Sequence, residues 1–207
     1  GGVALSEASS NASARRAGDN NNVRAIYPLG FLPFIDTDSK NLSVGAGVRG
    51  KSGAWDWDLS QLLGENQLKY FTHNTLNATL GANSPTRFYN GSLKFGQAVT
   101  NLDGKSTIDL GLPTPLKVAV GAEYRYDRYK IGAGEPNAYS NGGFRVLDGP
   151  STGAVPTVGA QGFGGIQPRD VVSKNRDSYS LYAEVEQDIN ERLRVSAAAR
   201  FEDYSDF

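Results

Sequence analysis

The sequence has no cysteine, no methionine and a single histidine, His73, among its 207 residues. Without cysteine the chain can form neither a disulfide nor a thiolate metal site. Its formal net charge is −1 at pH 7, so we expect no basic surface for nucleic acid. No apolar run approaches the ~18 residues that a membrane-spanning helix requires. Glycine is abundant, and together with Asn, Ser and Pro it favours turns and loops over helices.

Catalytic and metal-binding motifs are also missing or incomplete. The segment Gly45–Gly50 (GAGVRG) matches G-x-G-x-x-G, but a turn and a tryptophan-rich segment follow it, where the dinucleotide fingerprint needs a helix. The segment Asp36–Lys40 (DTDSK) begins like a calcium loop, yet it lacks the central glycine and the terminal glutamate. His73 has no cysteine or G-x-S-x-G serine to activate. We therefore expect no enzyme, no cofactor and no metal site.

The most informative stretch is Leu116–Tyr129 (LKVAVGAEYRYDRY), which alternates with a period of two. One set of alternate residues is apolar or aromatic, comprising Leu116, Val118, Val120, Ala122, Tyr124 and Tyr126. The other set is charged or small, which predicts a β-strand with unlike faces. At ~3.3 Å per residue the strand spans roughly 46 Å, whereas soluble strands usually have ~5–6 residues. A long strand with tyrosines at one end of its apolar face is typical of a membrane barrel.

The same alternation predicts an all-β fold, an antiparallel up-and-down meander of about six long strands that forms a slice of a transmembrane β-barrel. The predicted strands lie at about 41–50, 54–74, 93–109, 115–130, 176–187 and 192–205. We expect a kink or bulge near Gly64 and a poorly defined register around 101–105. Trp55 and Trp57, just after a short turn, fit an aromatic girdle.

The connections between these strands come in two kinds that alternate along the chain. Short turns are predicted near 50–53, 111–115 and 188–191, and long loops at about 1–38, 76–90 and 131–175. In an antiparallel meander this order places every short turn at one rim and every long loop at the other. Outer-membrane barrels show this asymmetry, with short periplasmic turns and long extracellular loops.

Several short blocks resemble a known family, the TonB-dependent outer-membrane receptors. The blocks are Trp55–Leu59 (WDWDL), Leu76–Asn90 (LNATLGANSPTRFYN), Gly121–Asn141 (GAEYRYDRYKIGAGEPNAYSN), Gly159–Pro168 (GAQGFGGIQP) and Arg200–Phe207 (RFEDYSDF). The resemblance runs from roughly Arg24 to Phe207. It implies a large plugged barrel of roughly 22 strands, in which this chain would be a middle slice.

The resemblance also implies a function and partners. Such receptors take up a scarce ligand, such as a siderophore, cobalamin or a sugar, across the outer membrane. Expected partners are outer-membrane lipid, the remaining barrel strands, the plug domain, the TonB complex through that plug, and the small-molecule ligand. The expected location is the cell outer membrane, and no contact with nucleic acid is expected.

Candidate ligand-binding residues lie on the polar strand faces and in the long loops. They are Glu123, Arg125, Asp127, Tyr139, Phe144, Phe163, Arg200 and Glu202. Neighbouring carboxylates at 123 and 127 suggest glycoside hydrolysis, but a network of opposite charges on a lumen wall explains them without catalysis. The loop aromatics suit either ligand contacts or internal packing of the loops.

Two other functional classes remain open from the sequence. A soluble all-β binding module, such as a lectin-like sandwich, would show the same alternation, and a secreted β-rich hydrolase is a more remote alternative. The environment of the face from Leu116 to Tyr126 separates the first of these from a barrel. A sandwich buries that face against a second sheet, whereas a barrel wall presents it to lipid.

Overall fold

The computed structural model of the chain describes residues 1–112 and 114–206 and is built around one antiparallel sheet. Seven strands follow each other in chain order across this sheet. They are β1 (Gly2–Asn11), β4 (Phe34–Ser52), β5 (Trp55–His73), β6 (Arg87–Ile108), β7 (Leu116–Ala133), β8 (Val172–Asn190) and β9 (Leu193–Tyr204). The predicted all-β antiparallel meander is therefore confirmed, and the sheet is not closed.

The sheet has two chemically different faces, because directly opposite residues in neighbouring strands point to the same side. On β7, Val120 pairs with Gly104 of β6 and Ala183 of β8, and all three lie on what we call the apolar face. The exposed apolar side chains on this face include Leu42, Val44, Val48, Trp55, Trp57, Leu59, Leu63, Leu102, Val120, Tyr124, Tyr179, Leu181, Val185 and Phe201. They form a continuous band from β4 to β9.

The tryptophans of the apolar face lie over glycines of the neighbouring strands. A Cβ at Gly50 would approach the Trp57 ring to 2.6 Å, and one at Gly104 would lie 3.3 Å from the Trp55 ring. Both rings therefore occupy the space that a side chain at Gly50 or Gly104 would need. Gly104 also explains why the alternation is weak around 101–105, where β6 runs on without interruption.

The sequence prediction was wrong about the first strand. Residues 1–38 were predicted as a loop, but Gly2–Asn11 forms β1 and pairs along its whole length with Ser43–Phe34 of β4. Serine and alanine dominate this segment, so its composition indicated a loop. Backbone hydrogen bonds to a long neighbouring strand need no particular side chains, and they decide the outcome here.

Other boundaries and the bulge also differ from the prediction. The strands β4 and β6 begin at Phe34 and Arg87, and β8 begins at Val172, so the loops are shorter than predicted at these ends. The register at Gly64 is regular, and the irregularity lies between Tyr70 and Phe71, opposite Asn90. Gly91, beside Asn90, has a φ of 126°, a conformation that glycine adopts without strain.

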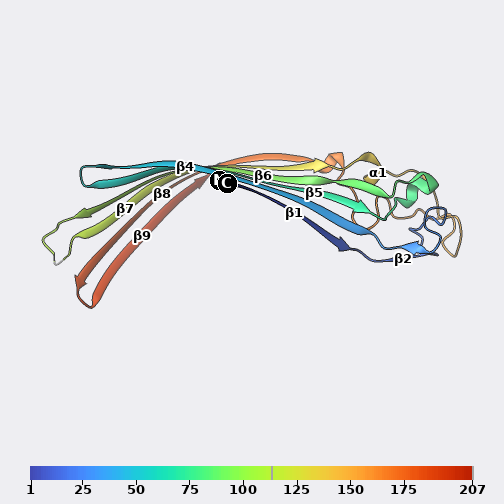
Figure 1. Cartoon of the computed structure of the whole chain (residues 1–207), viewed down its shortest axis with the longest axis horizontal. Coiled ribbons are helices and arrows are strands. Elements are labelled where there is room, and N and C mark those ends of the chain that lie inside the picture. Colours follow the sequence, from blue (N-terminus) through green and yellow to red (C-terminus); the bar gives the residue numbers. More distant parts are fainter. Residues whose placement is uncertain (113, 207) are drawn as a thin grey trace.

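Short turns and long connections separate at opposite ends of the sheet (Figure 1). The β4–β5, β6–β7 and β8–β9 connections form one end, and the predicted turn at Gly111–Pro115 includes Pro113, which lies outside the described residues. The other end holds the long connections 12–33, 74–86 and 134–171, which contain β2 (Arg15–Arg16), β3 (Gly30–Phe31), η1 (Ala78–Asn83), α1 (Pro136–Tyr139) and η2 (Pro168–Asp170). No helix in the described residues is long and apolar enough to span a membrane.

The three long connections pack together into one unit, which we call the loop cap. Its core has two clusters: Phe31, Leu76 and Ala78, flanked by Val23, Ile26 and Tyr27, and a second made of Phe88, Ala138 and Ala160. Residues from all three connections contribute to these clusters. The long loops therefore support one another, and most of the tightly buried apolar residues of the chain lie in or beside the cap.

Candidate functional site

Asn77 is the central polar residue of the loop cap, and its side chain is fully buried. Its Nδ2 donates to the carbonyl oxygens of Asn137 (2.9 Å) and Ser140 (2.8 Å). Its Oδ1 accepts from the Thr79 hydroxyl (2.7 Å) and from the backbone N–H groups of Thr79 and Gly159 (both 3.2 Å). One side chain thus joins the 74–86 connection to two separate parts of the 134–171 connection.

Asn90 links the sheet to the cap through hydrogen bonds, as Asn77 links the connections within the cap. It is the additional residue of the β6 bulge and is fully buried. Its Oδ1 accepts from the Thr72 hydroxyl at 3.1 Å, and its Nδ2 donates to the Phe163 carbonyl at 2.5 Å. Its own carbonyl accepts from the Ile166 N–H at 2.8 Å. The bulge therefore places the Asn90 side chain where it binds the 134–171 connection.

A cavity of about 190 Å³ lies within the cap, between the 12–33 connection, η1 and residues 144–148. Residues 146–154 form a small hairpin above it, with Val146 N–H donating to Ala154 and Gly153 N–H donating to Val146. An ion pair between Arg24 and Asp148 (3.1 Å) ties this hairpin to the 12–33 connection. The cavity is therefore enclosed by loops that are mutually linked.

The cavity lining combines apolar and polar surface. The Phe144 ring packs directly on Gly81, where a Cβ would lie 2.6 Å from the ring. The buried Oδ1 of Asn22 has no hydrogen-bond partner, and among residues 1–112 and 114–206 Arg145 has no ion pair. A guanidinium without an ion pair and an aromatic ring beside this partly open space suit a small ligand that carries an anionic group.

A separate polar network lies on the face of the sheet opposite the apolar face, which we call the polar face. Asp127 is 7% exposed, and both of its carboxylate oxygens are occupied. Gln97 donates to Oδ1 at 2.9 Å and Arg176 donates to Oδ2 at 3.1 Å. The Arg176 guanidinium also lies over the Tyr204 ring, 5.2 Å from its centroid. Asp127 is thus held by the two neighbouring strands, β6 and β8.

The network continues across β7, β8 and β9. Arg125 donates to Glu123 at 3.0 Å, and Arg200 approaches the same Glu123 oxygen at 3.5 Å while also donating to Glu202. Tyr182 donates to Asp103, and its ring occupies the space above Gly121 that a Cβ would fill. Charges of opposite sign therefore neutralise each other along this face.

The structure separates the predicted site residues into two groups. It brings Glu123, Arg125, Asp127, Arg200 and Glu202 together on the polar face, where they contact each other or the neighbouring strands.

The loop candidates lie apart from this network, in the cap. Phe163 packs against Tyr70 with ring centroids 5.4 Å apart, Phe144 covers Gly81, and Tyr139 is half-buried at the end of α1. Sequence reasoning missed Asn22, Asn77 and Asn90. The roles of Asn77 and Asn90 depend on partners far away in the sequence, whereas Asn22 stands out only because its buried Oδ1 has no partner.

His73 has a structural role that agrees with its place near a strand end. Its Nδ1 lies 2.6 Å from Asp36 Oδ2, and its ring stacks on Phe34 with centroids 5.0 Å apart. Ser9 donates to the other Asp36 oxygen at 2.7 Å. These contacts join β1, β4 and β5 just below the cap. Among the described residues, no group of three or more His, Asp or Glu side chains has the arrangement of a metal site.

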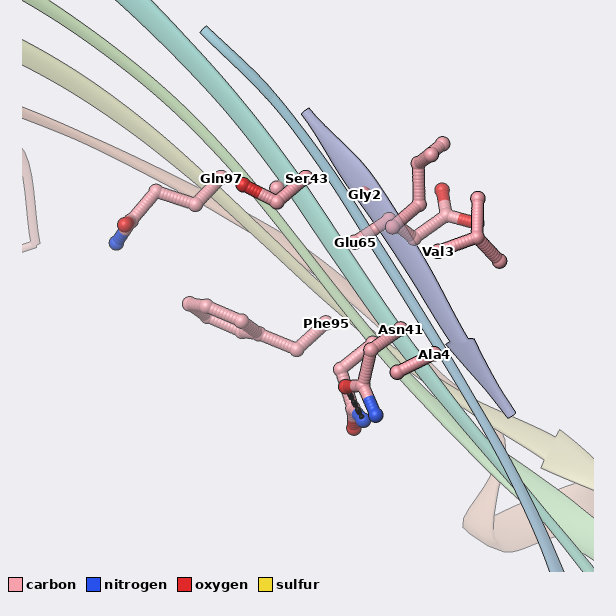
Figure 2. Close-up of a pocket in the computed structure, with 11 residues that line it drawn as sticks. Gly2, Val3, Ala4, Asn41, Ser43, Glu65, Phe95 and Gln97 are labelled. Carbon is pink, nitrogen blue, oxygen red and sulfur yellow. Dashed lines mark hydrogen bonds between the residues drawn. The ribbon is translucent and has the colours of Figure 1, made fainter. Parts of the chain in front are cut away.

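A hollow of about 480 Å³ lies where β1 meets β4, β5 and β6. Figure 2 shows Asn41, Phe95 and Gln97 on one side of the sheet there, and Val3 and Glu65 on the other. Because its lining comes from both faces, the hollow follows the edge of the sheet and is not a closed cleft. It does show directly how the two faces alternate.

The sequence was compared with families of known proteins. Residues 3–207 match the family described as TonB dependent receptor-like, beta-barrel. The chain belongs to this family. Comparison with curated proteins and with solved structures gave no match.

Membership of the TonB-dependent receptor family explains the two faces of the sheet. The family comprises outer-membrane receptors that act in transport and are not enzymes, and the predicted family is therefore confirmed. Outer-membrane barrels alternate lipid-facing and lumen-facing residues along every strand. The apolar and polar faces of this TonB-dependent receptor chain follow that alternation from β4 to β9.

Proposed function

We propose that the chain forms part of the barrel wall of a receptor for active uptake of a scarce small molecule. The observation that carries the proposal is the continuous exposed apolar band from β4 to β9, which includes Leu181 (62% exposed) and Phe201 (65%). Such a band is stable against hydrocarbon but not against water. The polar face, with its paired charges, then lines the lumen.

The open edges of the sheet support the same proposal. In the described residues, strands β1 and β9 each have one neighbour only, so each leaves a row of backbone N–H and C=O groups unpaired. In hydrocarbon each unpaired group costs several kcal/mol, and spanning sheets therefore close into barrels. We propose that further strands of the receptor pair with both edges, that a plug domain fills the lumen, and that the TonB complex acts through this plug.

A soluble lectin-like sandwich was the alternative, and the arrangement of the sheet disfavours it. A sandwich requires a second sheet packed on the apolar face. In residues 1–112 and 114–206 the only other sheet pairs the two-residue strands β2 and β3 inside the cap. The apolar face is left uncovered along its length, which a soluble module of this kind does not tolerate.

The loop cap is the proposed site of ligand capture. It contains the cavity of about 190 Å³, and the lining of this cavity has both apolar and polar groups. We propose that the cap faces the cell exterior and that ligand enters this cavity before it reaches the lumen. The exposed hairpin 146–154 lies over the cavity and is well placed to act as its cover.

The orientation is tested by protease added to intact cells. We expect cleavage within 147–155, because Leu147 is 80% exposed and Val155 49% exposed at the outer surface of the cap. The β8–β9 turn near 190–192 should stay intact until the outer membrane is opened. Cleavage at the turn in intact cells, with the hairpin protected, would reverse the orientation.

Uptake tests the role of the cavity. A strain without the gene should leave one compound unconsumed in the medium, and that compound identifies the ligand. Restoring the gene as Phe144→Ala with Arg145→Ala should raise the ligand concentration for half-maximal uptake roughly 10- to 100-fold, because a stacking and an ionic contact are lost. Leu29→Ala is the control, since Leu29 is 93% exposed in the cap and does not line the cavity. Unchanged uptake in the double variant would remove the cavity from the proposal.

A further inference from the structure

We propose that the cavity of the loop cap binds a free apolar α-amino acid, with one unpaired charge of the protein for each charge of the zwitterion. The cavity is the space of about 190 Å³ between the 12–33 connection, η1 and residues 144–148. The inference rests on the proposed function, because it names the class of small molecule that this site captures. It adds a partner for an ammonium group to the partner that Arg145 provides for an anionic group.

The size of the cavity limits the ligand. Binding sites for drug-sized molecules usually measure ~300–1,000 Å³. At about 190 Å³ the cap cavity is smaller than these sites, so it suits a molecule of the size of one amino acid. A whole iron–siderophore or cobalamin does not fit such a space, and a larger molecule would insert only one end.

Four charged side chains line the cavity, and two of them neutralise each other. These two are Arg24 and Asp148, which form the ion pair of 3.1 Å. The other two, Asp19 and Arg145, have opposite signs. In the part of the chain that the structure describes, neither forms an ion pair, with the other or with any further residue. The cavity therefore offers one unpaired carboxylate and one unpaired guanidinium, which together complement a zwitterion.

Hydrogen bonds hold Asp19 at the start of a tight turn. Its backbone N–H donates to the Arg16 carbonyl at 3.0 Å, and its own carbonyl accepts from the Asn22 N–H at 2.9 Å. Of its carboxylate oxygens, Oδ1 accepts from the Asn21 N–H at 2.8 Å. Oδ2 has no hydrogen-bond partner among the described residues and is left to accept from a ligand ammonium.

The backbone around Arg145 is fixed in a similar way. The N–H of Phe144 donates to the Thr79 carbonyl at 3.0 Å, and the N–H of Val146 donates to the Ala154 carbonyl at 2.9 Å. The Arg145 guanidinium itself makes no hydrogen bond within the described chain. A guanidinium binds a carboxylate through strong, often bidentate hydrogen bonds. Arg145 can therefore receive the carboxylate of an amino acid without breaking an existing contact.

The rest of the lining favours an apolar ligand side chain. Val23, Ala78 and the Phe144 ring all border the cavity. An apolar side chain placed against them leaves water, which favours binding. The simpler alternative is that Asp19 and Arg145 are ordinary solvated charges at the surface of the cap. The two explanations differ in selectivity, because solvated charges do not distinguish a zwitterion from its singly charged analogues.

The test uses the intact receptor purified in detergent, with L-phenylalanine as the probe. Hydrocinnamate lacks the ammonium group of phenylalanine, and phenethylamine lacks its carboxylate. The variants Asp19→Asn and Arg145→Gln each remove one charge, and asparagine keeps an acceptor for the Asn21 N–H. Asp170→Asn and Arg169→Gln are the controls, because these exposed residues of the same connection pair with each other and do not line the cavity. Calorimetric titration measures each Kd, and far-UV circular dichroism checks folding.

We expect Asp19→Asn to weaken phenylalanine binding roughly 10- to 100-fold, because a charge-assisted hydrogen bond is lost, and to leave hydrocinnamate within about twofold. Arg145→Gln should weaken phenylalanine and hydrocinnamate by a similar factor and leave phenethylamine within about twofold. Both controls should bind phenylalanine like the wild type.

The wild-type receptor gives an answer even if a variant does not fold. It should bind hydrocinnamate and phenethylamine at least roughly 10-fold more weakly than phenylalanine. Absence of phenylalanine binding, equal binding of the three probes, or equal losses in the controls would overturn the proposal.

Two dipeptides distinguish a free amino acid from the end of a longer chain. Phenylalanyl-glycine and glycyl-phenylalanine keep both charges but place them farther apart, so both should bind more weakly than phenylalanine. Tighter binding of either one would overturn the assignment to a free amino acid and assign the cavity to the end of a peptide.

This experiment fails separately from the proposed function, because binding in detergent requires neither uptake nor an orientation in the cell. If uptake of the compound found in the medium depends on the cavity but phenylalanine does not bind, the amino acid inference alone is wrong. If phenylalanine binds with the expected selectivity and Phe144→Ala/Arg145→Ala keeps normal uptake, the inference stands and the cavity is not the route of capture.

Discussion

Replacing Val120 with Arg is expected to lower the free energy of unfolding from lipid vesicles by about 2–4 kcal/mol. Val120 is 39% exposed and lies near the middle of the apolar run on β7, between Leu116 and Tyr126. If this face meets lipid, the guanidinium is placed near the bilayer midplane, far from both headgroup regions. Titration of the intact barrel between folded and unfolded states in vesicles measures the loss.

Ala119→Arg is the matched control, because it introduces the same side chain one residue away on the polar face. Ala119 borders an open hollow of about 360 Å³ that is also lined by Asp56, Glu184 and Glu186 and by Lys105 and Lys117, so the added cation meets water and charges of both signs there. We expect a change of less than about 1 kcal/mol. A larger loss for Ala119→Arg than for Val120→Arg would mean that the two faces have been assigned the wrong way round.

The sequence predicts the sheet well where alternation is strong and local. On β7, β8 and β9 a period of two is visible within each strand, and it gives both the strand and the direction of each side chain. The prediction fails for β1, because Val3 and Leu5 are its only large apolar residues and the rest of the strand is mainly Ser and Ala, so the alternation is too short to detect. That strand is specified by pairing with β4, which lies more than twenty residues further along the chain.

The loop cap could not be predicted in the same way. The side-chain partners of Asn77 are 60, 63 and 82 residues away in sequence, and no local pattern encodes them. For the polar face the sequence predicts part of the arrangement. Alternation placed Glu123, Arg125 and Asp127 on one face, but it did not show that Arg176 and Gln97 would occupy both oxygens of Asp127. The candidate residues were therefore found more readily than their roles.

Asn77→Leu is expected to unfold the loop cap while leaving the strands in place. Leucine has a similar size but offers no hydrogen bonds, so the buried Gly159 N–H and Asn137 and Ser140 carbonyls lose their Asn77 partner. Each buried polar group left unsatisfied costs about 1–3 kcal/mol. For these three groups the loss is roughly 3–9 kcal/mol, and we expect the cap's core, which consists of two small clusters, not to offset it.

Hydrogen exchange is the direct measurement for this variant, since it reports local opening of the cap separately from the sheet. Amides of the 134–171 connection should lose protection in Asn77→Leu, those of β7 and β8 should keep it, and ligand uptake should fall to the level of the gene deletion. Asn141→Leu is the control, because Asn141 is an exposed asparagine of the same connection whose side chain accepts only from Gly143. Asn77→Asp, which keeps the acceptor for Gly159 but loses both donors, should lie between the two. Wild-type protection and uptake in Asn77→Leu would show that the cap does not depend on this side chain. An equal loss of protection in Asn141→Leu would show that many substitutions in this connection destabilise the cap, so that Asn77 has no special role.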